Sequence, residues 1–180
     1  MTSLIEAILC EANLREANLD KANLKRANLA RADLMGANLR EANFEEANLK
    51  EAHLEMAYLE KANLKKADLR GAYLPRAHAR EAKFINAHLE GAKLVKAHLE
   101  GANFTGSYLF MANLEGANLA GTNFSMADLE ETNLRGTQQL TIDQLSKVKT
   151  LYNAKLDKEL LLSLKTKYPA LFDVPDKDDF

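Results

Sequence analysis

The chain has little of what most enzymes and secreted domains depend on. Its 180 residues include one cysteine, Cys10, and no tryptophan, which excludes an intramolecular disulfide framework and a cysteine-rich zinc module. No apolar run is long enough for a membrane-spanning helix, and residues 1–10 lack the basic start and small-residue cleavage site of a secretion signal. We therefore expect a cytoplasmic protein with no membrane partner.

Charge of one sign is also missing, as are the common catalytic motifs. Lys and Arg total 24 against 26 Asp and Glu, so no direct nucleic-acid binding is expected. Only five serines occur, and no glycine-rich phosphate loop, HExxH or CxxC spacing is present. The sequence predicts a protein that is not an enzyme and that has no cofactor.

What the sequence does have is a repeat. From Ala7 to Gly136 the chain divides into 26 consecutive five-residue units, each with a large apolar residue that we call the centre. The centres are 21 leucines, four phenylalanines and Ala79, and the residue two before the centre is alanine in 23 units. Asn or Asp usually stands directly before the centre, where its side chain can bond nearby backbone at a bend.

A period of five fits neither regular structure. On an α-helix each five-residue step rotates about 140°, so the leucines would scatter around the circumference. On a flat strand an odd period places successive leucines on opposite faces. The period indicates that each unit is a short extended piece followed by a turn, with the centre and the alanine two before it always pointing inward.

The repeated pattern A(D/N)LXX over residues 7–136 resembles the pentapeptide repeat family. The resemblance implies an all-β solenoid, a right-handed quadrilateral β-helix in which four units make one coil. The 26 units then give about 6.5 coils and, at about 4.8 Å per coil, a rod roughly 31 Å long.

The charges support a coil of four units. Among the two outward positions after each centre, residues 20 apart form 15 opposite-sign and two like-sign pairs, whereas separations of 15 and 25 give ten to seven and seven to six. Opposite charges on adjacent rungs favour this register over slips. The same register places all four phenylalanine centres on one wall and predicts an aromatic stack.

The repeat ends at Gly136, so the sequence predicts two units, a β-helix over 1–136 and a C-terminal helical cap and tail over 137–180. The residues Thr141 to Gln144 predict a capping box and a helix over 142–148, and a second helix is expected over 158–167. The start of the chain has no comparable helix. An open coil end there is a candidate surface for a homodimer.

One anomaly points to a contact surface. Over residues 53–108 the position before the centre holds a ring or a lysine in nine of the twelve units, in place of Asn or Asp, and all four histidines are among them. The candidate protein-contact band comprises His53, Tyr58, Tyr73, His78, His88, His98 and Tyr108. Stacking by 20 distributes it over three walls, with His78 and His98 as rung neighbours. The alternative is neutral variation at a surface position; no metal site is predicted, because this pair lacks further ligands.

Two further features lead to expectations about local structure. Pro75 and the small centre Ala79 predict irregular backbone near residues 75–80. Residues 97–134 contain no Lys or Arg and carry outward apolar side chains such as Phe110, Met111 and Met126. This smooth region is either a partner patch or the surface onto which the tail folds, and the second explanation is favoured.

The sequence leaves three classes of function to compare. The favoured one is a structural scaffold or protein-interaction module with an unidentified protein partner. The resemblance to the family implies an alternative, a DNA mimic that inhibits or modulates a type II topoisomerase such as gyrase. That role requires a continuous acidic surface, whereas residues 1–136 carry 17 basic and 19 acidic residues, interleaved along the predicted walls. An enzyme ranks last, because no nucleophile and base can be assembled.

Overall fold

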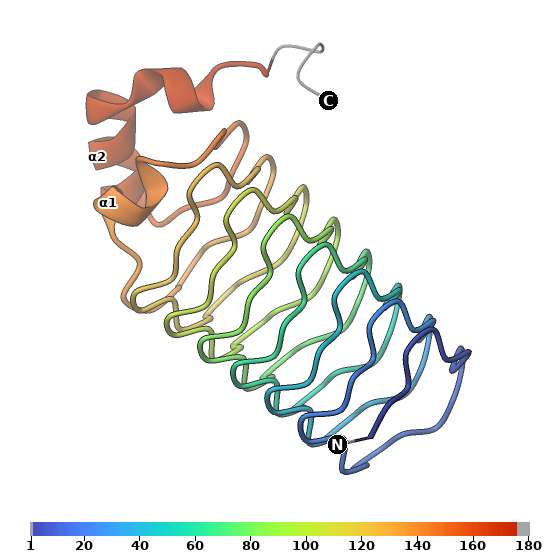
Figure 1. The fold of residues 1–180 in the computed structure, drawn as a ribbon. Helices are drawn as coiled ribbons and strands as arrows, with labels where there is room; N and C mark the ends of the chain where they lie inside the picture. Colours follow the sequence, from blue (N-terminus) through green and yellow to red (C-terminus); the bar gives the residue numbers. More distant parts are fainter. Residues whose placement is uncertain (1, 176–180) are drawn as a thin grey trace.

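The computed structural model describes residues 2–175 and shows a stack of coils with helices at one end. The coils follow one another from the N-terminus, and all helical segments lie beyond the last coil (Figure 1). The helix α1 comprises Ile142–Leu145, α2 comprises Lys158–Lys167, and the 3-10 helix η1 comprises Pro169–Phe172.

The extended segments are so short that each contributes a single bridging residue, the one before the centre. Parallel bridges run from Ser3↔Asn23 to Asn118↔Gln138 and always join residues 20 apart. Vertical neighbours are therefore four units apart, which confirms the predicted register.

Each corner between units is a hydrogen-bonded turn. At the corner after Leu9, the Ala12 amide donates to the Leu9 carbonyl at 3.1 Å, and Glu11, the third residue of the turn, has φ 58°. A positive φ at this position is the mark of a type II turn. The residue after the centre donates its amide to the Asn before the centre, as from Arg15 to Asn13 Oδ1 at 3.2 Å. The predicted role of Asn and Asp at the bends is thus confirmed.

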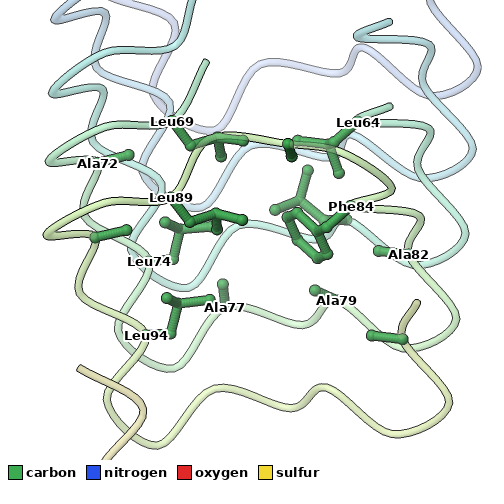
Figure 2. Packing of buried hydrophobic residues seen from close by; sticks show 14 of the residues in the cluster. Leu64, Leu69, Ala72, Leu74, Ala77, Ala79, Ala82, Phe84, Leu89 and Leu94 are labelled. Carbon is green, nitrogen blue, oxygen red and sulfur yellow. The ribbon is translucent and has the colours of Figure 1, made fainter. Parts of the chain in front are cut away.

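The interior consists of centres and alanines. From Leu24 to Leu134 every centre is at most 1% exposed, and Figure 2 shows leucine, alanine and phenylalanine side chains filling neighbouring coils. On the phenylalanine wall, the ring centroids of Phe84 and Phe104 are 4.6 Å apart and those of Phe104 and Phe124 are 5.3 Å apart. The predicted aromatic stack is confirmed for these three rings.

The prediction of irregular backbone near residues 75–80 is wrong. Met56 donates to the Pro75 carbonyl at 3.1 Å, Ala79 donates to the His98 carbonyl at 2.8 Å, and Arg76 has the usual corner φ of 56°. Proline fits here because the residue after a centre donates its backbone N–H to the Asn or Asp side chain before that centre and not to the neighbouring coil. Before this centre stands Tyr73, so Pro75 removes no hydrogen bond, and its fixed φ suits the second position of the turn.

The C-terminal segment completes the last rung. Asp128 bridges Thr150 and Asn133 bridges Lys155, so parallel bridging continues beyond the boundary at residue 136 that the repeat suggests. The separation here is 22 in place of 20, because α1 interrupts the chain between the last regular unit and this rung. α1 is shorter than the predicted 142–148, whereas α2 has the predicted bounds.

Helix α1 is tied to the last coil by one side chain. The Gln144 Oε1 accepts the Thr141 amide in the predicted capping box, and the Gln144 Nε2 donates to the carbonyls of Leu119 and Thr122, both at 2.8 Å. Asp157 does not cap α2 but accepts the Gly136 amide at 3.1 Å.

The tail folds onto the last coil of the smooth region over residues 97–134 but leaves the outward apolar side chains of this region exposed. Phe110, Met111 and Met126 are 37%, 57% and 65% exposed, so the favoured explanation, that the tail folds onto this region, holds for the last coil and not for these side chains. Helix α1 contacts the last coil through Gln144. Within residues 2–175, no helix combines the length and apolar character needed to cross a membrane.

Candidate functional site

Outward charges form ion-pair ladders across the rungs. Arg26 contacts Glu6 and Glu46 at 3.4 and 2.9 Å, and Lys25 contacts Glu45 at 3.2 Å. Other pairs 20 apart follow the same rule. Because signs alternate along these ladders, the corners carry no continuous stretch of one charge.

The seven residues of the candidate contact band form three separate ring stacks on three walls. His53 stacks on Tyr73 with ring centroids 4.9 Å apart, and His88 stacks on Tyr108 at 4.8 Å. The third stack has three members, Tyr58, His78 and His98, and we call it the Tyr58 stack. The structure therefore joins neighbours 20 apart and does not bring the whole band into one site.

In the Tyr58 stack the ring faces are occupied within the rod. The centroid separations are 5.1 and 4.8 Å, and the rings are inclined by 12° and 5°. The guanidinium of Arg40 lies over the Tyr58 ring, 4.3 Å from its centroid. The next rung after His98 is Asn118, whose amide donates to Glu100 Oε1 at 2.8 Å. What the stack offers a partner is therefore its outward edge, with the tyrosine hydroxyl and imidazole nitrogens.

The histidines on all three walls have carboxylates two residues later. His53 Nδ1 lies 3.0 Å from Glu55, His88 Nδ1 lies 3.1 Å from Glu90, and His98 Nδ1 lies 3.9 Å from Glu100. His78 is followed by Arg80 and has no such carboxylate, so it is the exception in the centre of the Tyr58 stack.

Beside the Tyr58 stack runs an open groove with a volume of about 640 Å³. One side of the groove is a column of corner residues. The other side is the Tyr58 stack together with the residues that follow it on later rungs, Asn118 and Gln138. The lining residues are Met56, Tyr58, Arg76, His78, Lys96, Ala97, His98, Gly116, Asn118, Gly136 and Gln138. The sequence pattern identified the rings but not this groove. The feature that could have indicated it is the like-charge pair Arg76 and Lys96, 20 residues apart, where most ladders alternate in sign.

Two carboxyl groups elsewhere show how local charge acts on this surface. Burial raises the pKa of Asp68, but hydrogen bonds from Arg70 and Lys50 outweigh burial and hold this pKa below its ordinary value. The pKa of Glu130 is raised, first by burial and then by the charges of Asp128 and Glu131. The second group lies in the region without cations, where no basic side chain offsets the repulsion.

Within residues 2–175, no three His, Cys, Asp or Glu side chains are grouped so as to hold a metal ion. His78 and His98 are rung neighbours, as the register predicts. Cys10 is exposed and accepts a contact from the Asn28 amide nitrogen at 3.6 Å.

At the N-terminal end, Ser3, Ile8, Asn13 and Asn18 form bridges on one side only within the described residues. Ile8 is 82% exposed. Homodimer formation through this coil end stays a prediction.

Comparison with known proteins gives the family. A family model for pentapeptide repeats matches residues 2–36, 27–65, 62–101 and 97–136. The chain belongs to the pentapeptide repeat family. Membership implies a right-handed β-helical solenoid, in agreement with the parallel bridges between positions four units apart.

Solved pentapeptide repeat proteins resemble this one over most of their length. HetL, involved in heterocyst differentiation regulation in the cyanobacterium Nostoc sp. strain PCC 7120, is 30% identical, with 85% of this chain and 78% of HetL covered and a TM-score of 0.42. QnrB1, a plasmid-mediated fluoroquinolone resistance protein, is 19% identical, with 91% and 92% covered and a TM-score of 0.47. A search of curated proteins found no match.

Proposed function

We propose that this pentapeptide repeat protein is a non-enzymatic scaffold that binds another protein through the wall carrying the Tyr58 stack. The rod of about 6.5 four-sided coils, closed at its C-terminal end by α1 and α2, holds that wall in one shape. A solenoid presents an extended surface without rearranging, so little ordering cost is incurred on binding.

The change of side chains along one column is the observation that carries this proposal. In earlier coils the column is Asn18 and Asn38, and Asn38 Nδ2 donates to Asn18 Oδ1 at 3.1 Å. It then changes to Tyr58, His78 and His98, which present polar edges on apolar bodies. Side chains of this kind are favoured at protein interfaces.

Inhibition of a topoisomerase by DNA mimicry is less well supported. Mimicry of a duplex needs a continuous negative surface. Most outward ladders alternate in sign, as in Glu6, Arg26 and Glu46, so negative charges are interrupted from rung to rung. A supercoiling assay in which micromolar protein leaves gyrase unaffected would exclude this role.

The test of the scaffold function compares captured partners. A triple variant, Tyr58→Asn with His78→Asn and His98→Asn, restores the residue that the repeat normally has and should keep the fold. The matched control is His88→Asn with Tyr108→Asn, which removes a stack from another wall. We expect a pull-down from the source organism's lysate to lose its partner with the triple variant only. Equal recovery with both variants would contradict the proposal.

A further inference from the structure

Two pairs of neighbouring cations depart from the charge rule of this rod. Among the outward positions, like charges stand 20 apart only twice, at Lys50 with Arg70 and at Arg76 with Lys96. In the first pair Asp68 lies between the cations, 3.3 Å from Lys50 and 2.6 Å from Arg70. The repulsion there is compensated within the protein.

The second pair has no such compensation. Within residues 2–175, the structure shows no ion pair and no side-chain hydrogen bond for Arg76 or Lys96. The column beside the first pair provides Asp68, whereas the column beside Arg76 and Lys96 holds His78 and His98 and provides no carboxylate. Like charges on adjacent rungs are destabilising, so the pair lowers stability unless an anion from outside lies between them.

Both cations line the groove beside the Tyr58 stack. The Lys96 stem lies over the next corner, where a Cβ added at Gly116 would be 3.2 Å from Lys96 Cγ and 3.9 Å from Lys96 Cε. Glycine at this corner therefore leaves room for the lysine stem. The groove combines two uncompensated positive charges with the hydrogen-bonding edges of three rings.

We propose that this groove binds an extended, acidic segment of a partner protein, with its carboxylates between Arg76 and Lys96. The inference rests on the proposed scaffold function and names the partner's chemistry. The groove spans five rungs, from Met56 to Gly136, which is about 19 Å and matches about six extended residues. Carboxylates two residues apart on an extended chain recur on one side about every 6.6 Å, within reach of two flexible cations on adjacent rungs.

The ring geometry favours a peptide over single-stranded nucleic acid. Nucleic acid binding without sequence preference uses free aromatic faces on which bases stack. Here the faces of Tyr58 and His78 are covered by neighbouring rings and by Arg40. The exposed edges suit carboxylate and carbonyl acceptors better than bases.

Fluorescence anisotropy with a defined probe tests the proposal. The probe is a fluorescein-labelled peptide of alternating glutamate and threonine, and the comparison peptides replace glutamate by glutamine or lysine. We expect saturable binding of the glutamate peptide only, weakened about fivefold or more by Arg76→Gln with Lys96→Gln and by raised salt. The matched control, Lys65→Gln with Lys66→Gln, removes the same charge from another corner and should bind as the unmodified protein does.

Three results would overturn the inference. The first is absence of saturable binding at millimolar glutamate peptide, and the second is equal binding by the Arg76/Lys96 variant. The third is tighter binding of oligothymidylate than of the peptide, lost in the same variant, which would assign the groove to nucleic acid. If the lysate partner is lost by the triple asparagine variant but kept by the Arg76/Lys96 variant, the scaffold function stands and only the acidic segment fails.

Discussion

Replacing Phe104 by leucine tests whether the stacked rings contribute more than their burial. Phe104 is fully buried between two rings, with centroids at 4.6 and 5.3 Å and planes inclined by 4° and 17°. Phe44 is a matched control on the same wall, because it is equally buried but its rung neighbours are Leu24 and Leu64. Leucine is the usual centre, so neither substitution disturbs the backbone turn.

The expected difference follows from these contacts. A stacked aromatic pair contributes about 0.5 to 1.5 kcal/mol beyond its buried area, so two pairs contribute about 1 to 3 kcal/mol. Phe44→Leu should cost about 1 to 2 kcal/mol through lost volume alone. Phe104→Leu should cost that amount and the stacking contribution in addition.

Urea unfolding followed by circular dichroism measures both costs, provided that the two variants have the same m value. A double-mutant cycle of Phe84→Leu and Phe104→Leu isolates one stacked pair and should give a coupling of about 0.5 to 1.5 kcal/mol. If the two single variants lose equal stability, or if the cycle shows no coupling, the rings act only through burial and the reasoning fails.

Three further changes probe the bends, the corners and the C-terminal closure. Asp68→Asn keeps an acceptor for the Arg70 amide but removes the negative charge between Lys50 and Arg70, so stability should fall by about 0.5 to 1 kcal/mol at neutral pH. The pKa of Asp68 is lowered in the folded protein, so the ionised carboxylate stabilises the fold above its unfolded-state pKa, and this stabilisation is lost as pH falls through the folded-state pKa. The unfolding curves of the variant and the unmodified protein should therefore converge in acid. A difference in stability that persists in acid would contradict the role of the Asp68 charge. Gln144→Glu removes two donors to carbonyls of the last coil and should cost about 1 to 3 kcal/mol by urea unfolding, whereas an unchanged midpoint would mean that α1 does not secure the coil end. Gly101→Ala, at φ 67°, should cost about 1 kcal/mol in the same assay, and a stabilised variant would refute the strain argument for the corners.

The repeat predicted the register and the interior because both depend on features repeated in every unit. One period of five forces each Leu and the Ala two before it inward, and the sign of the outward charges then selects four units per coil. The backbone near Pro75 was predicted wrongly because the expectation considered the cavity at Ala79 and not which amides the ladder uses. A proline at a position that gives no hydrogen bond to the neighbouring coil is harmless.

The last rung and the groove were beyond prediction for different physical reasons. Thr150 and Lys155 join the coils through backbone hydrogen bonds, in which their carbonyls accept the amides of Leu129 and Leu134. Any residue has a backbone carbonyl, so no side-chain pattern marks this rung. The groove depends on the direction of long side chains and on the missing Cβ of Gly116, which the repeat does not encode. The ring stacks themselves were predictable, since they need only the register.

The corners explain why uncompensated cations indicate a function. The third residue of each turn has positive φ, where glycine is unstrained and other residues cost of order 1 kcal/mol. From residue 101 onward five of the eight corners in the repeat are glycine, and none of the eight is a cation; before it, most corners are charged. A charged corner is thus mostly kept where it takes part in a ladder. Arg76 and Lys96 bear the same strain, at φ 56°, without an ion pair to offset it. Within the described residues these two side chains form no ion pair, which agrees with the proposal that the groove binds an anionic segment.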